Sequence, residues 1–172
     1  MISRMLDRSQ SVALVVVLAV AVSGTGCNQP QGDGESHGNV SPHLLHQVGT
    51  IQFVKDPATG FQLAAERNLP CLLFFTAKWC TYCHDMQETA FVDPTIGELA
   101  EGFICIEVDA DREKRLCQRY RVAGFPTVQF IAADGRALHR LVGKQSANSL
   151  ATGMRAASQR FAWLSGASSK AL

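Results

Sequence analysis

The chain has 172 residues, of which 47% are hydrophobic and 18% are charged, and its formal net charge is +1. This length can hold one folded core but hardly two domains. A charge so close to zero gives no electrostatic basis for nucleic-acid binding or for general attraction to a membrane surface.

Residues 1–26 have the layout of a signal peptide of the lipoprotein type. Two arginines precede an apolar stretch over 12–22, which is short for a transmembrane helix. Small residues then lead into Cys27, which is similar to the bacterial lipobox, whose cysteine is lipidated after cleavage. Gly24 occupies a position where lipoboxes usually carry an aliphatic residue, so a soluble exported form and an uncleaved anchor stay as alternatives. We expect export to the periplasmic side of a bacterial membrane and anchoring through Cys27.

Residues 27–49 are rich in Gly, Gln, Ser, Pro and His, and they predict a flexible tether in front of a folded domain over 50–165. The tether contains His37, His43 and His46, which could bind a metal ion. Scattered histidines in a tether are more often solvated, so we expect no metal site.

The sequence of this domain predicts strands and helices in alternation. One apolar run is hydrophobic on both faces, as in a buried parallel strand, and Asp134-Gly135 predicts a hairpin turn. Residues 166–172 predict a frayed tail. The expected strands are 51–54, 69–76, 103–108, 127–132 and 136–142, and the expected helices are 57–68, 81–91, 94–101, 110–120 and 146–163.

The most informative segment is Trp79-Cys80-Thr81-Tyr82-Cys83, at the junction of a buried strand and a helix. Helical residues three apart have Cβ atoms roughly 5–6 Å apart, so Cys80 and Cys83 are within disulfide reach. At the helix N-terminus, unpaired N–H groups and the helix dipole should lower the pKa of Cys80 below the value of about 8.5 for a free thiol. Cys83 lies one turn further and should stay protonated until needed. The pair predicts one attacking and one resolving cysteine.

Two other kinds of site contain a Cys-x-x-Cys pair. A structural zinc site needs a second pair of ligands, and the remaining cysteines form no second Cys-x-x-Cys. With His84 added, Cys80 and Cys83 match the attachment pattern of a c-type haem, with His84 as axial ligand. The buried strand before Trp79 and the downstream segment 124–127 argue against haem, which stays as an alternative.

With these features together, the chain resembles the thioredoxin superfamily over about residues 50 to 163. Within it, the segment 77–94 is most similar to the C-terminal domain of the thiol:disulfide interchange protein DsbD and to small exported relatives. The resemblance implies an α/β thioredoxin fold, with a central mixed sheet flanked by helices on both faces. The matching motifs are Trp-Cys-x-x-Cys at 79–83, Gly-Phe-Pro-Thr at 124–127, Val108-Asp109 at a strand end and Gly143 in the last hairpin.

The resemblance also implies a function. Cys80 and Cys83 would exchange disulfides with exported proteins, with no cofactor beyond the redox-active disulfide itself. The likeness to DsbD favours a reductase, and it implies a membrane electron donor as a second partner. The residues expected to contact the substrate are Trp79, Tyr82, Phe125 and Pro126, with a cis peptide bond before Pro126.

The resemblance fails at a buried ion pair. Thioredoxins usually bury an Asp six residues before the first active cysteine and pair it with a Lys on the next strand. Here these positions are Phe74 and Cys105. Cys83 must therefore lose its proton to another group, such as water, His84 or the substrate thiolate. A redox-silent adaptor that only binds a partner is a further alternative.

The other cysteines have a simpler interpretation. Cys71 and Cys105 fall in expected buried strands, where a small buried hydrophobic residue is the default. Cys117 falls on an expected helix, and a disulfide between Cys105 and Cys117 stays open in an oxidising compartment.

Overall fold

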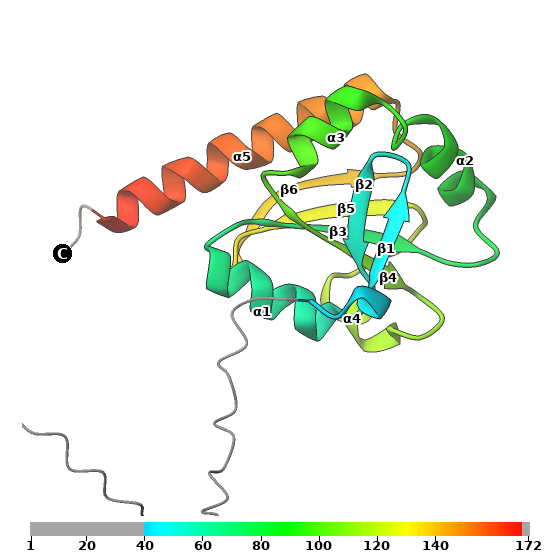
Figure 1. The fold of residues 1–172 in the computed structure, drawn as a ribbon, viewed down its shortest axis with the longest axis horizontal. Coiled ribbons are helices and arrows are strands. Elements are labelled where there is room, and N and C mark those ends of the chain that lie inside the picture. The colour runs from blue at the N-terminus through cyan, green and yellow to red at the C-terminus, as the bar shows by residue number, and fades with distance from the viewer. Residues whose placement is uncertain (1–39, 170–172) are drawn as a thin grey trace, which may run out of the picture. The chain divides into compact units, whose positions relative to one another are not determined.

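Six strands form one mixed sheet in the order β1-β2-β4-β3-β5-β6 (Figure 1). The computed structural model describes residues 40–169. Strands β2, β4 and β3 are parallel to one another, and the other neighbouring pairs are antiparallel. The strands are β1 (Leu45–Val48), β2 (Ile51–Val54), β3 (Cys71–Thr76), β4 (Ile104–Asp109), β5 (Thr127–Ile131) and β6 (Ala137–Val142). The helices are α1 (Pro57–Arg67), α2 (Thr81–Thr89), α3 (Pro94–Ala100), α4 (Lys114–Arg119) and α5 (Ala147–Ser169), and Pro42–Leu44 form a 3₁₀ turn.

Helices cover both faces of the sheet (Figure 1). Because side chains alternate along a strand, β3 feeds two cores: Leu72 and Phe74 pack with α2, α3 and α5, whereas Leu73 and Phe75 pack with α1 and α4. All six residues of β3 are buried, as expected for a central strand covered on both faces. The predicted α/β architecture is confirmed.

Local signals in the sequence set several element boundaries. Asp56 caps α1, with its carboxylate accepting hydrogen bonds from the Thr59 N–H (2.8 Å) and hydroxyl (2.6 Å). Asn68 ends that helix in the left-handed conformation, with φ 50°. Asp134 Oδ1 accepts from the Arg136 N–H (3.0 Å) in the hairpin between β5 and β6. Ser146 Oγ accepts from the Ser149 N–H (3.2 Å) at the start of α5. The hairpin turn predicted at Asp134-Gly135 is confirmed, and α1 and the start of α5 lie within one residue of the predicted boundaries.

The predicted tether over 27–49 is wrong at its C-terminal end, because Leu45–Val48 form β1 and pair with β2. The turn between them needs Gly49: its φ is +57°, and a Cβ there would come within 2.3 Å of the Phe91 carbonyl oxygen. The Thr50 N–H donates to the same carbonyl (2.7 Å). Contacts with residues some 40 positions further along the chain thus hold a segment that looks unstructured in the sequence.

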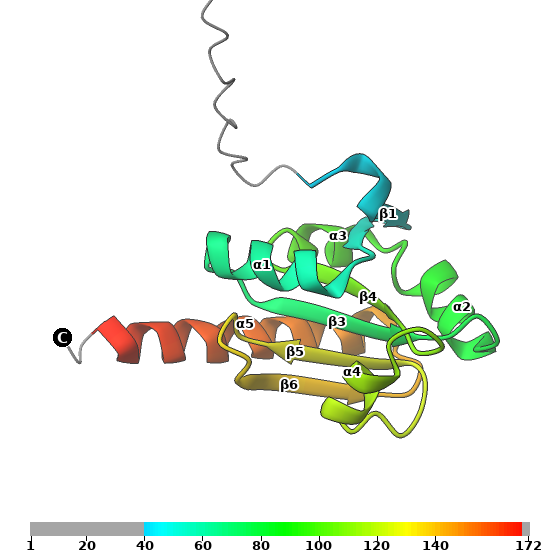
Figure 2. The same cartoon turned by 90° about the horizontal axis from the view of Figure 1, so that it is seen from below.

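Two helix lengths also differ from the prediction. Residues 110–113 form a turn on the Asp109 carbonyl, which accepts from the Arg112 and Glu113 N–H groups, so α4 is shorter than expected. Helix α5 runs to Ser169, past the predicted end near residue 163, and so includes the first part of the predicted frayed tail. The sequence there contains no proline to stop it. Its last turns extend beyond the sheet (Figures 1 and 2).

The predicted signal peptide (1–26) and the lipidation site Cys27 lie outside the described residues. Over residues 40–169, none of the helices combines the length and apolar character that crossing a lipid bilayer requires.

Candidate active site

Cys80 is the N-cap residue of α2, at the end of the loop that follows β3 (Figure 2). Its sulfur accepts a hydrogen bond from the Cys83 N–H (3.1 Å), in the first turn of the helix. Its carbonyl accepts from the N–H groups of Cys83 (3.0 Å) and His84 (3.2 Å). The helix therefore directs backbone dipoles at the Cys80 sulfur, as the sequence predicted.

Cys80 and Cys83 form a disulfide, with their Cα atoms 5.2 Å apart. This separation lies within the usual disulfide range. Cys80 keeps 5% exposure, whereas Cys83 is fully buried. The predicted order, with an outer and an inner cysteine, is confirmed in its geometry.

Two large aromatic side chains face solvent, one before the cysteine pair in the sequence and one between the two cysteines. Trp79 is 67% exposed and Tyr82 is 66% exposed. Trp79 packs edge-on against Phe125, with ring centroids 5.6 Å apart. Its indole Nε1 donates to Asp111 Oδ1 (3.2 Å). The structure thus brings Trp79 and Phe125 together, and it places Tyr82 on the exposed side of the first turn of α2.

The Phe125-Pro126 peptide bond is cis, as the resemblance implied. Neighbouring groups hold this turn: the Thr127 hydroxyl donates to the Gly124 carbonyl (2.8 Å), and the Gly143 N–H donates to the Pro126 carbonyl (2.8 Å). The two motifs that are 45 residues apart in the sequence are therefore linked in space through the contact between Trp79 and Phe125.

Helix α2 is fixed at both its buried and its exposed sides. Cys83 and Met86 are fully buried in the core. On the exposed side, Asp85 forms an ion pair with Lys144, which follows β6. His84 Nε2 donates to the Lys78 carbonyl (3.0 Å) and so ties the helix to the loop before the disulfide.

The positions of the missing ion pair are apolar, as predicted. Phe74 is fully buried and Cys105 is 4% exposed. Phe74 packs in an aromatic cluster with Phe53 and Phe91, at centroid distances of 6.0 and 4.9 Å. Because this cluster fills the space on the α2 face of β3, no charged group could be accommodated there without a large desolvation cost.

Sequence reasoning missed an acid and a base near this site. Glu107 lies on β4, and its carboxylate Oε2 is 2.7 Å from Nδ1 of His46 on β1. A Glu inside the otherwise apolar run 103–108 was a visible signal, since a charge in a buried strand needs a partner. His46 lay in the predicted tether, where it was considered only as one of three scattered histidines that could bind a metal ion, and nothing in the sequence indicated a contact with Glu107.

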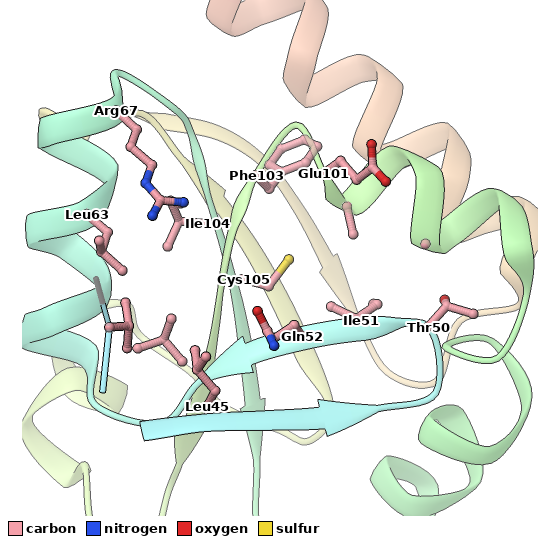
Figure 3. A pocket seen from close by; sticks show the side chains of 14 residues that line it. Leu45, Thr50, Ile51, Gln52, Leu63, Arg67, Glu101, Phe103, Ile104 and Cys105 are labelled. Carbon is pink, nitrogen blue, oxygen red and sulfur yellow. The ribbon is translucent and has the colours of Figure 1, made fainter. Parts of the chain in front are cut away.

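The remaining cysteines of the described part of the chain are not paired with one another. Burial raises the pKa of Cys71 to about 12, and burial together with the nearby Cys71 raises the pKa of Cys105 to about 12. Cys105 lines a cavity of about 480 Å³ beside Ile51 and Gln52 of β2 (Figure 3). Cys117 packs on the opposite face of the sheet from Cys105, so the disulfide that the sequence left open between them does not form.

Residues 58–158, more than half of the chain, match the model of the thioredoxin-like domain. The chain belongs to the thioredoxin-like family. The thiol:disulfide interchange protein DsbD of Vibrio vulnificus is 29% identical over 89 residues, which is 49% of this chain and 15% of that protein. The chain thus corresponds to a small part of this relative.

Solved structures agree on the thioredoxin fold. A thioredoxin from Thermus thermophilus superposes with a TM-score of 0.54 at 26% identity, over 59% of this chain and 82% of that one. The reduced C-terminal domain of Neisseria meningitidis DsbD superposes with a TM-score of 0.50 at 24% identity, over 58% of this chain and 90% of that one, and it bears on the fold alone.

Family and geometry together assign a chemistry to the cysteine pair. The chain is a thioredoxin-like oxidoreductase with a disulfide-capable pair, Cys80 and Cys83. This favours thiol–disulfide exchange over haem attachment as the use of the Cys-x-x-Cys-His sequence.

Proposed function

We propose that this protein is an exported, lipid-anchored protein-disulfide reductase. The observation that carries the proposal is the Cys80–Cys83 disulfide at the N-terminus of α2, with the Cys80 sulfur accepting a backbone N–H. That arrangement stabilises negative charge on Cys80 once the disulfide is reduced. The disulfide itself is the only redox group that the mechanism needs.

The first step is attack by Cys80. As a thiolate, its sulfur forms a bond to one sulfur of a substrate disulfide, and the other substrate sulfur leaves as a thiolate. Cys80 reacts first because it has the exposed edge, whereas Cys83 is fully buried. The product is a mixed disulfide between Cys80 and the substrate.

The second step is resolution by Cys83. Its thiol loses a proton, its sulfur bonds to the Cys80 sulfur, and the bond from Cys80 to the substrate breaks. The substrate leaves with both of its sulfurs reduced. The protein has lost two electrons and now contains the Cys80–Cys83 disulfide. The Cα separation of 5.2 Å means that this bond closes with little backbone movement.

The exposed aromatic groups supply a docking surface for an extended substrate. Trp79 and Tyr82 offer large apolar faces to solvent, and the cis Phe125-Pro126 turn lies against Trp79. Aromatic side chains of this kind contribute much of the binding energy at protein interfaces. In the proposal, the backbone of Phe125 forms hydrogen bonds with the substrate strand.

The proposed location of the protein and the proposed direction of electron flow are based on the sequence and on similar proteins. The layout of residues 1–26 supports export, and the small residues before Cys27 support a lipid anchor. The similarity to DsbD, named a thiol:disulfide interchange protein, supports a reductase acting on disulfide-containing exported proteins. A membrane electron donor then has to reduce the Cys80–Cys83 disulfide after each turnover.

Insulin reduction tests the exchange reaction. The wild type should reduce insulin in the presence of dithiothreitol, Cys80→Ser should lose at least about a hundredfold in rate, and Cys83→Ser should accumulate a mixed disulfide. Cys117→Ser is the matched control, because it removes a partly exposed thiol far along the sequence from the pair. Equal rates for the wild type and Cys80→Ser would support the alternative of a redox-silent adaptor.

Equilibration with glutathione tests the direction. A reductase should have a potential near that of thioredoxin, about −270 mV, and an oxidase one near that of DsbA, about −120 mV. A value at the oxidising end would overturn the reductase assignment and leave the exchange chemistry intact.

A further inference from the structure

The resolving thiol has no assigned proton acceptor. Cys83 is fully buried, and a thiol must become a thiolate before it attacks a disulfide. Phe74 and its aromatic neighbours exclude an acid from the space on the α2 face of β3. An acidic residue that accepts this proton therefore has to lie elsewhere on the face of the sheet that α2 covers.

Glu107 lies on that face. Along β4, Ile106 and Val108 belong to the core under α1 and α4, so Glu107 between them projects to the side of α2. In the sheet register, Glu107 is directly opposite Phe74. Its side chain is only 16% exposed. Glu107 is thus a largely buried carboxylate beside the position that Phe74 fills.

His46 holds this carboxylate. Nδ1 of His46 is 2.7 Å from Oε2 of Glu107, and an ionised carboxylate only accepts, so the ring nitrogen donates. The His46 side chain is 40% exposed. The pair thus connects a buried carboxylate with solvent. His46 reaches it only because the unexpected strand β1 lies at the edge of the sheet.

A cavity of about 260 Å³ joins the pair to the active-site helix. Its wall includes His84, the residue after Cys83, and Gln87, one turn further along α2. The volume is enough for several water molecules, and the wall offers them polar partners. The other charged or titratable groups that face Glu107 in this cavity are His46, Lys55, Lys78, His84, Asp109 and Arg112.

We propose that Glu107, positioned by His46, accepts the proton of Cys83 through water in this cavity. The inference rests on the proposed function. In the resolution step the Cys83 S–H bond breaks, the proton passes to the Glu107 carboxylate, and the new thiolate bonds to the Cys80 sulfur. The bond from Cys80 to the substrate breaks, and the substrate leaves as a thiolate that solvent protonates. Glu107 then returns its proton to solvent at the His46 side, so no additional oxidant or reductant is consumed.

The two steps are separable with dithionitrobenzoate, an aromatic disulfide. Equimolar reagent is mixed with the reduced full chain, in which Cys27 and Cys117 are replaced by serine. Attack by Cys80 releases one coloured thionitrobenzoate, and resolution by Cys83 releases a second. For Glu107→Gln we expect an unchanged first phase and a second phase slowed at least about tenfold near pH 7. The slowed phase should regain rate as the pH rises, because hydroxide then removes the proton.

Matched variants separate proton transfer from a structural effect. Glu107→Asp keeps the carboxylate and should recover part of the second phase. Glu98→Gln makes the same charge change at an exposed position of α3 and should leave both phases unchanged. His84→Gln tests the other base in the cavity wall: its amide can still donate to the Lys78 carbonyl, and it should leave the second phase within about twofold of the wild type.

An unchanged second phase in Glu107→Gln would overturn the inference and leave the proposed function in place. A slow second phase in His84→Gln alone would assign the acceptor to His84 instead. A wild type with no first phase would remove the proposed function, and with it this inference.

Discussion

Cys80 and Cys83 lie at the N-terminus of α2, whereas Cys71 and Cys105 lie inside the neighbouring strands β3 and β4. The Cys80 sulfur accepts a backbone N–H and has an edge in solvent. In the strands, burial raises the pKa of both thiols to about 12. The same residue type is therefore set up for exchange in one place and kept protonated in the other, because a backbone N–H contacts the Cys80 sulfur whereas burial surrounds the two strand thiols.

Selective alkylation should show this difference most strongly. In the native reduced protein at pH 7, iodoacetamide should modify Cys80 at least about a thousandfold faster than Cys71 or Cys105. With a pKa of about 12, only roughly one strand thiol in 10⁵ is ionised at that pH. Peptide mapping after timed quenching measures the three rates. Unfolding in urea is the control, and comparable labelling of all three sites without urea would break the comparison.

The prediction of the fold from sequence was strongest where the signal was local. The Cys-x-x-Cys pair follows an apolar strand, and its position at the helix start depends only on neighbouring residues. Asp56 and Ser146 likewise mark helix starts through caps within three residues.

Tertiary contacts decided what the sequence did not reveal. Strand β1 depends on β2 and on the close approach of Gly49 to Phe91. The contact of His46 with Glu107 joins residues 61 positions apart. The candidate site was therefore predictable at its two sulfurs and its cis proline, and it was not predictable in the cavity beside α2.

The free energy of unfolding at alkaline pH should reveal the raised pKa values of Cys71 and Cys105. Folding raises their pKa from about 8.5 to about 12, so above about pH 9 the unfolded state binds fewer protons than the folded state. The stability that these thiols contribute is complete below pH 8.5 and is lost as the pH rises toward 12. Each thiol should steepen this loss by about 1.4 kcal/mol per pH unit. Urea titrations between pH 9 and 10 measure the slope.

The single variants Cys71→Ala and Cys105→Ala sharpen that measurement. Each variant should reduce the pH dependence of the unfolding free energy by about 1.4 kcal/mol per pH unit, the contribution of one thiol, whatever its effect on stability at pH 7. A wild-type slope that neither variant changes would contradict the assignment of raised pKa values to these two buried thiols.

The exposed Trp79 should matter for substrate binding and hardly for the free energy of unfolding. Trp79→Ala removes a side chain that is 67% exposed, together with its edge-on contact with Phe125. We expect KM for insulin to rise roughly five- to tenfold, the equivalent of about 1 to 1.4 kcal/mol. The urea midpoint should stay close to that of the wild type. Trp163→Ala, which removes an equally exposed Trp on α5, should change neither quantity.

The ion pair between Asp85 and Lys144 should have the smallest effect. Both side chains are about 40% exposed, so Lys144→Ala should cost at most about 0.5 kcal/mol of unfolding free energy. Insulin reduction should fall by less than about twofold. Arg136→Ala breaks another exposed pair, with Asp134, and serves as the control. A loss of activity above tenfold in Lys144→Ala alone would show that the pair positions α2 for exchange.

The most direct test of the account is to map the covalent adduct of a trapped substrate. Reduced Cys83→Ser is incubated with oxidised insulin, quenched in acid, and digested for mass spectrometry without reduction. The account predicts one mixed disulfide, between Cys80 and an insulin cysteine. An adduct at Cys71, Cys105 or Cys117, or no adduct at all, would contradict the claim that the N-terminus of α2 is the place of exchange.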